Sequence, residues 1–101
     1  MQPVDLARLA EQTGGDRKLE REVLTLFLDD ALVQVARLRS AGAADRRAIA
    51  HRLLGSARAI GADEVARLAA AVETGQGDVD ALAAAIDAAR QYIVAYVAKP
   101  E

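Results

Sequence analysis

The chain has 101 residues, of which 52% are hydrophobic and 28% are charged, and its formal net charge is −2. This length suits one domain spanning residues 1–101, and the composition is that of a folded globular protein rather than a disordered chain. The absence of cysteine excludes a disulfide scaffold, a zinc–thiolate site and a cysteine nucleophile, and a single histidine argues against a histidine-based metal cage. We therefore expect no metal site.

The charge balance and the hydropathy pattern also bear on partners and location. A net charge of −2 argues against general nucleic-acid binding. No apolar stretch approaches the roughly 20 residues that are needed to span a bilayer. The first residues, Met1-Gln2-Pro3, lack the basic and apolar regions of a signal peptide. These features predict a cytoplasmic domain that binds neither nucleic acid nor a membrane.

Alanine, with 24 copies, dominates the hydrophobic residues. It favours helix and buries little area per residue, so its helices have to pack closely. Glycine, proline and capping residues divide the chain into five predicted helices. In chain order they are Asp5–Gln12 before Gly14-Gly15, a long helix from the cap Asp16 to Gly42, Ala43–Ile60 before Gly61, a helix from about Ala62 to Gly75, and one from the cap Asp78 to Pro100.

Apolar residues recur at helical spacing in the long segments. In the second segment the core stripe runs from Leu19 to Leu38, and four further apolar residues widen it beyond one packed face: Leu26, Leu28, Leu32 and Val33. Short glycine turns between such helices predict an all-α fold. We expect an antiparallel, up-down four-helix bundle with the first helix as a short N-terminal lid.

The third predicted helix carries the only histidine, His51. At 100° per residue, the apolar stripe of this helix is centred about 180–200° from His51, so the imidazole should face solvent. Its neighbours on the outer face are Arg47, Leu54, Gly55 and Arg58. Residues 45–58 hold four arginines and one aspartate, a local charge of +3, so the rest of the chain carries −5.

These residue types suit an imidazole that accepts a phosphoryl group. A neutral, exposed imidazole is a good nucleophile near pH 7. Arg47 and Arg58, one and two turns away, would supply the positive charge that a phosphoryl group in transfer needs. Gly55 costs about 1 kcal/mol of helix stability relative to alanine, and its missing side chain would let a partner approach His51.

Glu73 is a second candidate, because it should lie level with His51. If Gly61 is the turn, the two residues lie roughly 15 and 18 Å from it along antiparallel helices. A carboxylate at this place would accept a hydrogen bond from Nδ1–H and leave Nε2 free as the nucleophile. The alternative interpretation is a surface glutamate near a helix end.

Residues 51–62, His-x-Leu-x-Gly-Ser-Ala-x-x-Ile-Gly-Ala, resemble the signature of histidine phosphotransfer (HPt) domains of two-component phosphorelays. The resemblance extends over the whole five-helix chain. It implies that His51 takes a phosphoryl group from a receiver aspartate or a kinase and passes it to another receiver. Glu or Gln is common in this family at the place of Glu73.

The same resemblance implies partners and cofactors. The partners would be response-regulator receiver domains and a hybrid sensor histidine kinase. Mg²⁺ and the acid–base groups would belong to the receiver. The chain itself would then be a monomeric phosphocarrier, not an enzyme, and would hold no cofactor.

One position departs from the family pattern. Lysine is common three residues after the histidine, where this chain has Leu54. Either Arg47 or Arg58 replaces it, or transfer is slow, or transfer is lost. If transfer is lost, the domain would be an adaptor that binds a receiver or kinase without accepting phosphate. An RNA-binding role is disfavoured by the charge and by the lack of stacking aromatics beside the arginines. The candidate docking residues are Leu54, Gly55, Leu28 and Leu32.

Overall fold

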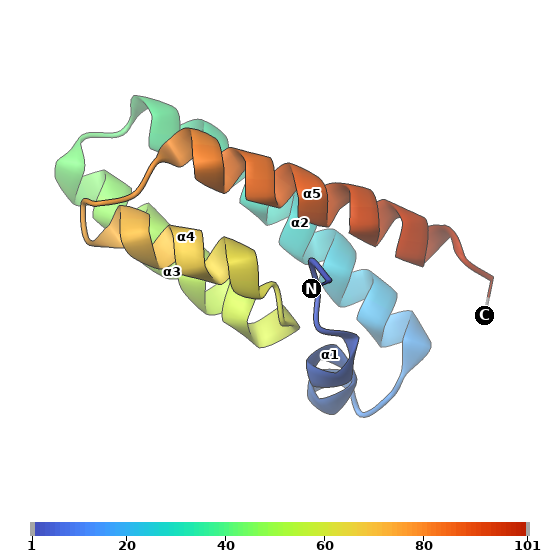
Figure 1. The fold of residues 1–101 in the computed structure, drawn as a ribbon. Coiled ribbons are helices and arrows are strands. Elements are labelled where there is room, and N and C mark those ends of the chain that lie inside the picture. The colour runs from blue at the N-terminus through green and yellow to red at the C-terminus, as the bar shows by residue number, and fades with distance from the viewer. Residues whose placement is uncertain (1, 101) are drawn as a thin grey trace.

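The computed structural model describes residues 2–100, and these form five α-helices (Figure 1). In chain order the helices are α1 (Leu6–Thr13), α2 (Arg17–Ser40), α3 (Ala43–Ile60), α4 (Asp63–Glu73) and α5 (Val79–Ala98). Helices α2 and α4 each pack against both α3 and α5, so the four long helices form a closed bundle. The predicted all-α bundle with a short N-terminal helix is confirmed. None of these helices, within residues 2–100, is long and apolar enough to cross a membrane.

Helix boundaries follow the capping residues. Asp5, Asp16 and Asp78 accept hydrogen bonds from backbone N–H groups in the first turns of α1, α2 and α5. Gly14 and Gly61 end α1 and α3 with φ of +64° and +78°. The predicted caps Asp16 and Asp78 and the predicted stops at Gly14 and Gly61 are therefore confirmed. The second and fourth helices end slightly before the predicted glycines, since Ala41 and Thr74 are the C-caps of α2 and α4.

Leucine, isoleucine and alanine build the interior of the bundle. The alanines let the helix axes approach closely, since their side chains add little bulk between helices. The molecule is consequently slender, 43 × 22 × 21 Å along its principal axes. The alanines with no exposed surface are Ala31, Ala50, Ala57, Ala62, Ala69 and Ala89.

One core position on α2 holds a carboxylate. Glu20 is 5% exposed, whereas Leu19, the predicted start of the core stripe, is 40% exposed. Glu20 accepts hydrogen bonds from the Tyr96 hydroxyl on α5 (2.8 Å) and the Thr13 hydroxyl on α1 (3.4 Å). The Arg17 guanidinium lies over the Tyr96 ring, 5.3 Å from its centroid. These partners satisfy the buried carboxylate and join α1, α2 and α5 at one end of the bundle.

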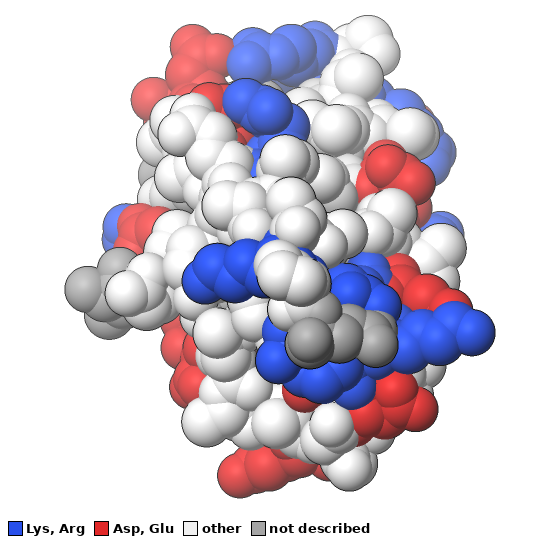
Figure 2. All heavy atoms as spheres, turned by 90° about the vertical axis from the view of Figure 1, so that its right-hand side faces the viewer, with Lys and Arg blue, Asp and Glu red and all other residues white. Residues whose placement is uncertain are grey.

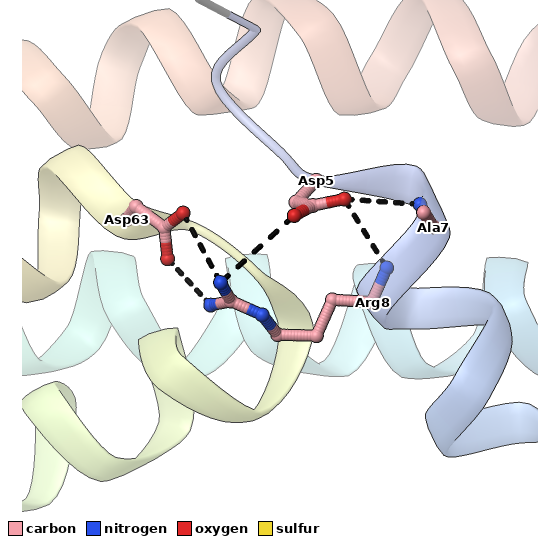
Figure 3. Close-up of polar contacts among 4 residues, drawn as sticks. All are labelled: Asp5, Ala7, Arg8 and Asp63. Carbon is pink, nitrogen blue, oxygen red and sulfur yellow. Dashed lines mark hydrogen bonds and ion pairs between the residues drawn. The ribbon is translucent and has the colours of Figure 1, made fainter.

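Helix α1 is anchored at the turn between α3 and α4 (Figure 3). Arg8 pairs with Asp63 at 2.6 Å and lies 3.9 Å from the Asp5 carboxylate. The backbone N–H of Asp5 donates a hydrogen bond to the Gly61 carbonyl (2.8 Å). The lid helix thus fixes the turn that joins α3 to α4.

Candidate functional site

His51 lies in the middle of α3 with its side chain 73% exposed, as the helical spacing predicts. Its Nδ1 atom is 2.7 Å from Oε2 of Glu73, the last residue of α4. An ionised carboxylate has no proton to donate, so Nδ1 carries the hydrogen and donates it. Nε2 then keeps a free lone pair. The predicted level placement of His51 and Glu73 is confirmed.

A short turn brings the two residues together. Gly61 ends α3, Ala62 is fully buried, and α4 begins at Asp63. The interface between α3 and α4 contains buried alanines, so the two helices run close enough for one side-chain hydrogen bond to cross between them. The His51–Glu73 pair is therefore held by two helices rather than by a loop.

Two arginines flank His51 along α3. Arg47 precedes it by one turn and Arg58 follows it by two, both within about 40° of its direction on the helix. Both are exposed, and within residues 2–100 neither guanidinium has an ion-pair or hydrogen-bond partner. A hollow of about 390 Å³, lined by Arg47 and Glu73 among others, lies between the start of α3 and the end of α4.

Leu54 is 7% exposed and belongs to the core. The prediction that it lies on the exposed face beside His51, as a docking residue, is wrong. Helix α3 packs against α1, α2 and α4, so its buried arc extends from Ile49 to Leu54 through about 140°. That arc is wider than the stripe expected for a helix with one packed face.

On the side of His51 that faces away from Arg47 and Arg58, the surface of α3 carries small residues. Gly55 is exposed, and a Cβ atom built there would meet nothing within 4 Å. Ala48 and Ala59, on the same side of the helix, are exposed as well. Another protein surface can therefore approach the α3 backbone close to the imidazole.

Leu28 and Leu32 do not lie near His51. On α2 both point within about 20° of the direction of Arg39, which pairs with Asp80 of α5 at 2.7 Å. They consequently line the α5 edge of α2, away from α3. The sequence prediction grouped them with Gly55 because it had no information on which edge of α2 faces α3.

Two exposed apolar residues, Leu26 and Val33, lie on the edge of α2 that faces α3. Asp30, which lies within about 60° of both on the helix, is 3.7 Å from Arg52 of α3. Leu26 and Val33 are 69% and 55% exposed, and the antiparallel register places them just beyond and just before the level of His51. In the sequence they were recognised only as additional apolar residues. The handedness of the bundle decides which side of α2 faces α3, and residue spacing does not predict that handedness.

The remaining surface features concern metals and charge. Among residues 2–100, no group of three or more His, Asp or Glu side chains is placed to hold a metal ion. At the end of the molecule seen in Figure 2, basic and acidic side chains are interspersed. The chemistry of the site thus consists of an exposed imidazole, a carboxylate that orients it, and two exposed guanidinium groups.

Comparison with known proteins agrees with this geometry. The sequence matches the Hpt domain family over residues 22–98, which include all of α3 and α4. The structure is similar to the crystal structure of the histidine phosphotransferase ShpA from Caulobacter crescentus, with a TM-score of 0.80 and 31% sequence identity over 93% of this chain and 89% of that chain. A search of curated proteins finds no significant match. The chain belongs to the Hpt domain family of histidine phosphotransfer proteins.

Proposed function

We propose that this domain is a phosphocarrier in which Nε2 of His51 accepts a phosphoryl group from a receiver aspartate or a kinase and passes it to another receiver. The observation that supports this most directly is the 2.7 Å contact between Nδ1 of exposed His51 and Glu73. It favours the tautomer with a nucleophilic Nε2. Membership of the Hpt family supports the class of partner.

The transfer exchanges one bond for another. The Nε2 lone pair forms the N–P bond while the P–O bond to the donor aspartate breaks, and the aspartate leaves as a carboxylate. The imidazole ring gains positive charge in this step, and Glu73 stabilises that charge through the Nδ1 hydrogen bond. A Mg²⁺ ion held by the receiver would neutralise charge on the phosphoryl oxygens, so this chain needs no cofactor and acts as a carrier rather than an enzyme.

In this proposal Arg47 and Arg58 supply the positive charge that a lysine commonly supplies in this family at the position of Leu54. Guanidinium groups pair well with phosphoryl oxygens. Because neither arginine has a partner within residues 2–100, binding the phosphoryl group breaks no existing ion pair. Leu54 is buried and offers no donor.

The test of the carrier function is phosphoryl labelling of His51. Incubation with a phosphorylated receiver domain should give an acid-labile, base-stable label on the wild-type protein and none on His51→Gln. At an exposed position such a substitution changes the free energy of unfolding by less than about 0.5 kcal/mol, so circular dichroism and urea unfolding should be unchanged. Full labelling of His51→Gln contradicts the proposal. Tight binding of the phosphorylated receiver with no label on the wild type favours the adaptor alternative.

The arginine role predicts a loss of transfer rate. Arg47→Ala with Arg58→Ala should slow labelling at least tenfold, since a lost charge-assisted hydrogen bond costs about 1.5–3 kcal/mol. The matched control is Arg39→Ala with Arg90→Ala, which removes the same charge at α2 and α5. Equal slowing of the two double variants would show that only net charge matters.

A further inference from the structure

Arg52 directly follows His51 in α3 but points to the opposite edge of the helix, toward α2. Its guanidinium lies 3.7 Å from the Asp30 carboxylate, and its side chain is mostly exposed. This distance is too long for a hydrogen bond. By contrast, Arg39 and Asp80 meet at 2.7 Å. Arg52 is therefore held loosely.

Asp30 does not depend on Arg52. Its carboxylate also accepts a hydrogen bond from the Gln34 amide (3.1 Å), and the Gln34 amide oxygen accepts one from Arg37 (3.2 Å). Gln34 is buried, so this chain of hydrogen bonds on α2 is fixed in place. If Arg52 moves away, Asp30 keeps a donor and no buried polar group is left unpaired.

The loose pair stands in the middle of the surface that a partner would cover. Leu26 and Val33 lie on the same edge of α2 and are largely exposed. The face of α3 around Gly55, which carries small residues, continues this surface to His51. A receiver whose phosphoaspartate reaches Nε2 would therefore lie across Arg52 as well.

We propose that Arg52 is a specificity-determining residue, which leaves Asp30 and pairs with a carboxylate of the receiver domain that docks on the α2–α3 surface. This inference rests on the proposed carrier function. Asp30 acts as an internal competitor for the partner's carboxylate. A receiver without an acidic group at that place gains nothing from displacing Arg52, so the exchange of ion pairs discriminates between receivers.

The test measures the rate of His51 labelling against the concentration of a phosphorylated receiver domain. Arg52→Ala should raise the half-saturating receiver concentration at least about fivefold, because an attractive charge pair is lost. Asp30→Asn should lower it by about twofold, because the competitor is removed while Gln34 keeps a partner. The maximal rate should be unchanged in both variants, and Arg90→Ala on α5 serves as the control for loss of one positive charge.

The opposite directions of the two effects separate this proposal from a structural role. If the ion pair only fastened α2 to α3, both substitutions would weaken docking alike, and that result would overturn the inference. A half-saturating concentration for Arg52→Ala equal to that for Arg90→Ala would overturn it as well. Phosphoramidate donates a phosphoryl group without a partner protein. Labelling of the wild type by phosphoramidate therefore shows whether the relay function or only the Arg52 inference has failed. If phosphoramidate labels His51 but no receiver does, the relay function and this inference both fail; if receivers label it and Arg52→Ala has no effect, only this inference fails.

Discussion

At the position of Gly55, a side chain would stabilise the helix but hinder the approach of a partner. A side chain here would enter open space, and glycine is among the poorest helix formers. Gly55→Gln should therefore raise the free energy of unfolding by about 0.5 kcal/mol. The same side chain would stand one turn from His51 and obstruct an approaching receiver. Urea unfolding and the rate of receiver-to-His51 transfer measure the two effects.

Gly55→Ala is the matched control for this prediction. It stabilises the helix by about 1 kcal/mol but adds only a methyl group to the surface. Transfer should be slowed much less than in Gly55→Gln. Undiminished transfer in both variants would remove the argument that the glycine provides access.

Individual residues differ in how well their place can be predicted from the sequence. Glu73 could be placed opposite His51 by counting from Gly61, because both helices are regular and the rise per residue is constant. Leu54 was misplaced because burial depends on how many neighbours a helix has, and α3 has three. A helical-wheel projection of a single helix does not show how many helices pack against it.

The turn between α3 and α4 depends on a glycine that touches α1. Gly61 has a φ of +78°, and a Cβ atom there would lie 2.8 Å from Cβ and 2.9 Å from the carbonyl oxygen of Asp5. Gly61→Ala should lower the free energy of unfolding by about 1–3 kcal/mol from backbone strain alone, and further from the clash. Urea unfolding measures the loss.

Gly15→Ala provides the matched comparison at the α1–α2 turn. Gly15 has a similar φ of +81° but no neighbour within 4 Å of the added Cβ. The difference between the two variants therefore reports the contact between the α3–α4 turn and Asp5. Equal destabilisation would mean that this contact contributes nothing measurable.

The ends of the elements were more predictable than their faces. Asp16 and Asp78 cap the helices that they were expected to cap, because capping depends on local hydrogen bonds. The residues of α2 that face the core were harder to predict. Glu20 takes a core position in place of Leu19, since its partners Tyr96 and Thr13 come from distant elements that no local pattern identifies.

The hydrogen bond from the Tyr96 hydroxyl to Glu20 joins α5, the last helix, to α2. Burial, together with the hydrogen bond to Glu20, raises the pKa of the Tyr96 hydroxyl above its usual value near 10. The protonated phenol is therefore favoured in the folded state. Its contribution to stability is complete below the pKa of an unfolded tyrosine and is lost as the pH rises through the higher folded value.

Tyr96→Phe should lower the free energy of unfolding by about 1–3 kcal/mol at pH 7, because it leaves a buried carboxylate oxygen without its donor. The difference from the wild type should shrink above about pH 10, where the phenol of the unfolded chain loses its proton while the folded state still holds it. Urea unfolding between pH 7 and alkaline pH measures this. Tyr92→Phe is the control, since its hydroxyl has no hydrogen-bond partner within residues 2–100. A constant difference at all pH values would contradict the role of the Tyr96 proton.

The exposure of His51 sets the time scales on which the whole molecule can operate. Nε2 faces water on the outside of two packed helices, so a partner reaches it without any opening of the fold. Delivery is then limited by productive collisions, which for protein pairs occur at about 10⁵–10⁷ M⁻¹s⁻¹. In the proposed carrier, an acceptor reaches the phosphoryl group as directly as a donor reaches the imidazole, so the fraction of molecules that carry phosphate would follow the supply from donors and the demand from acceptors.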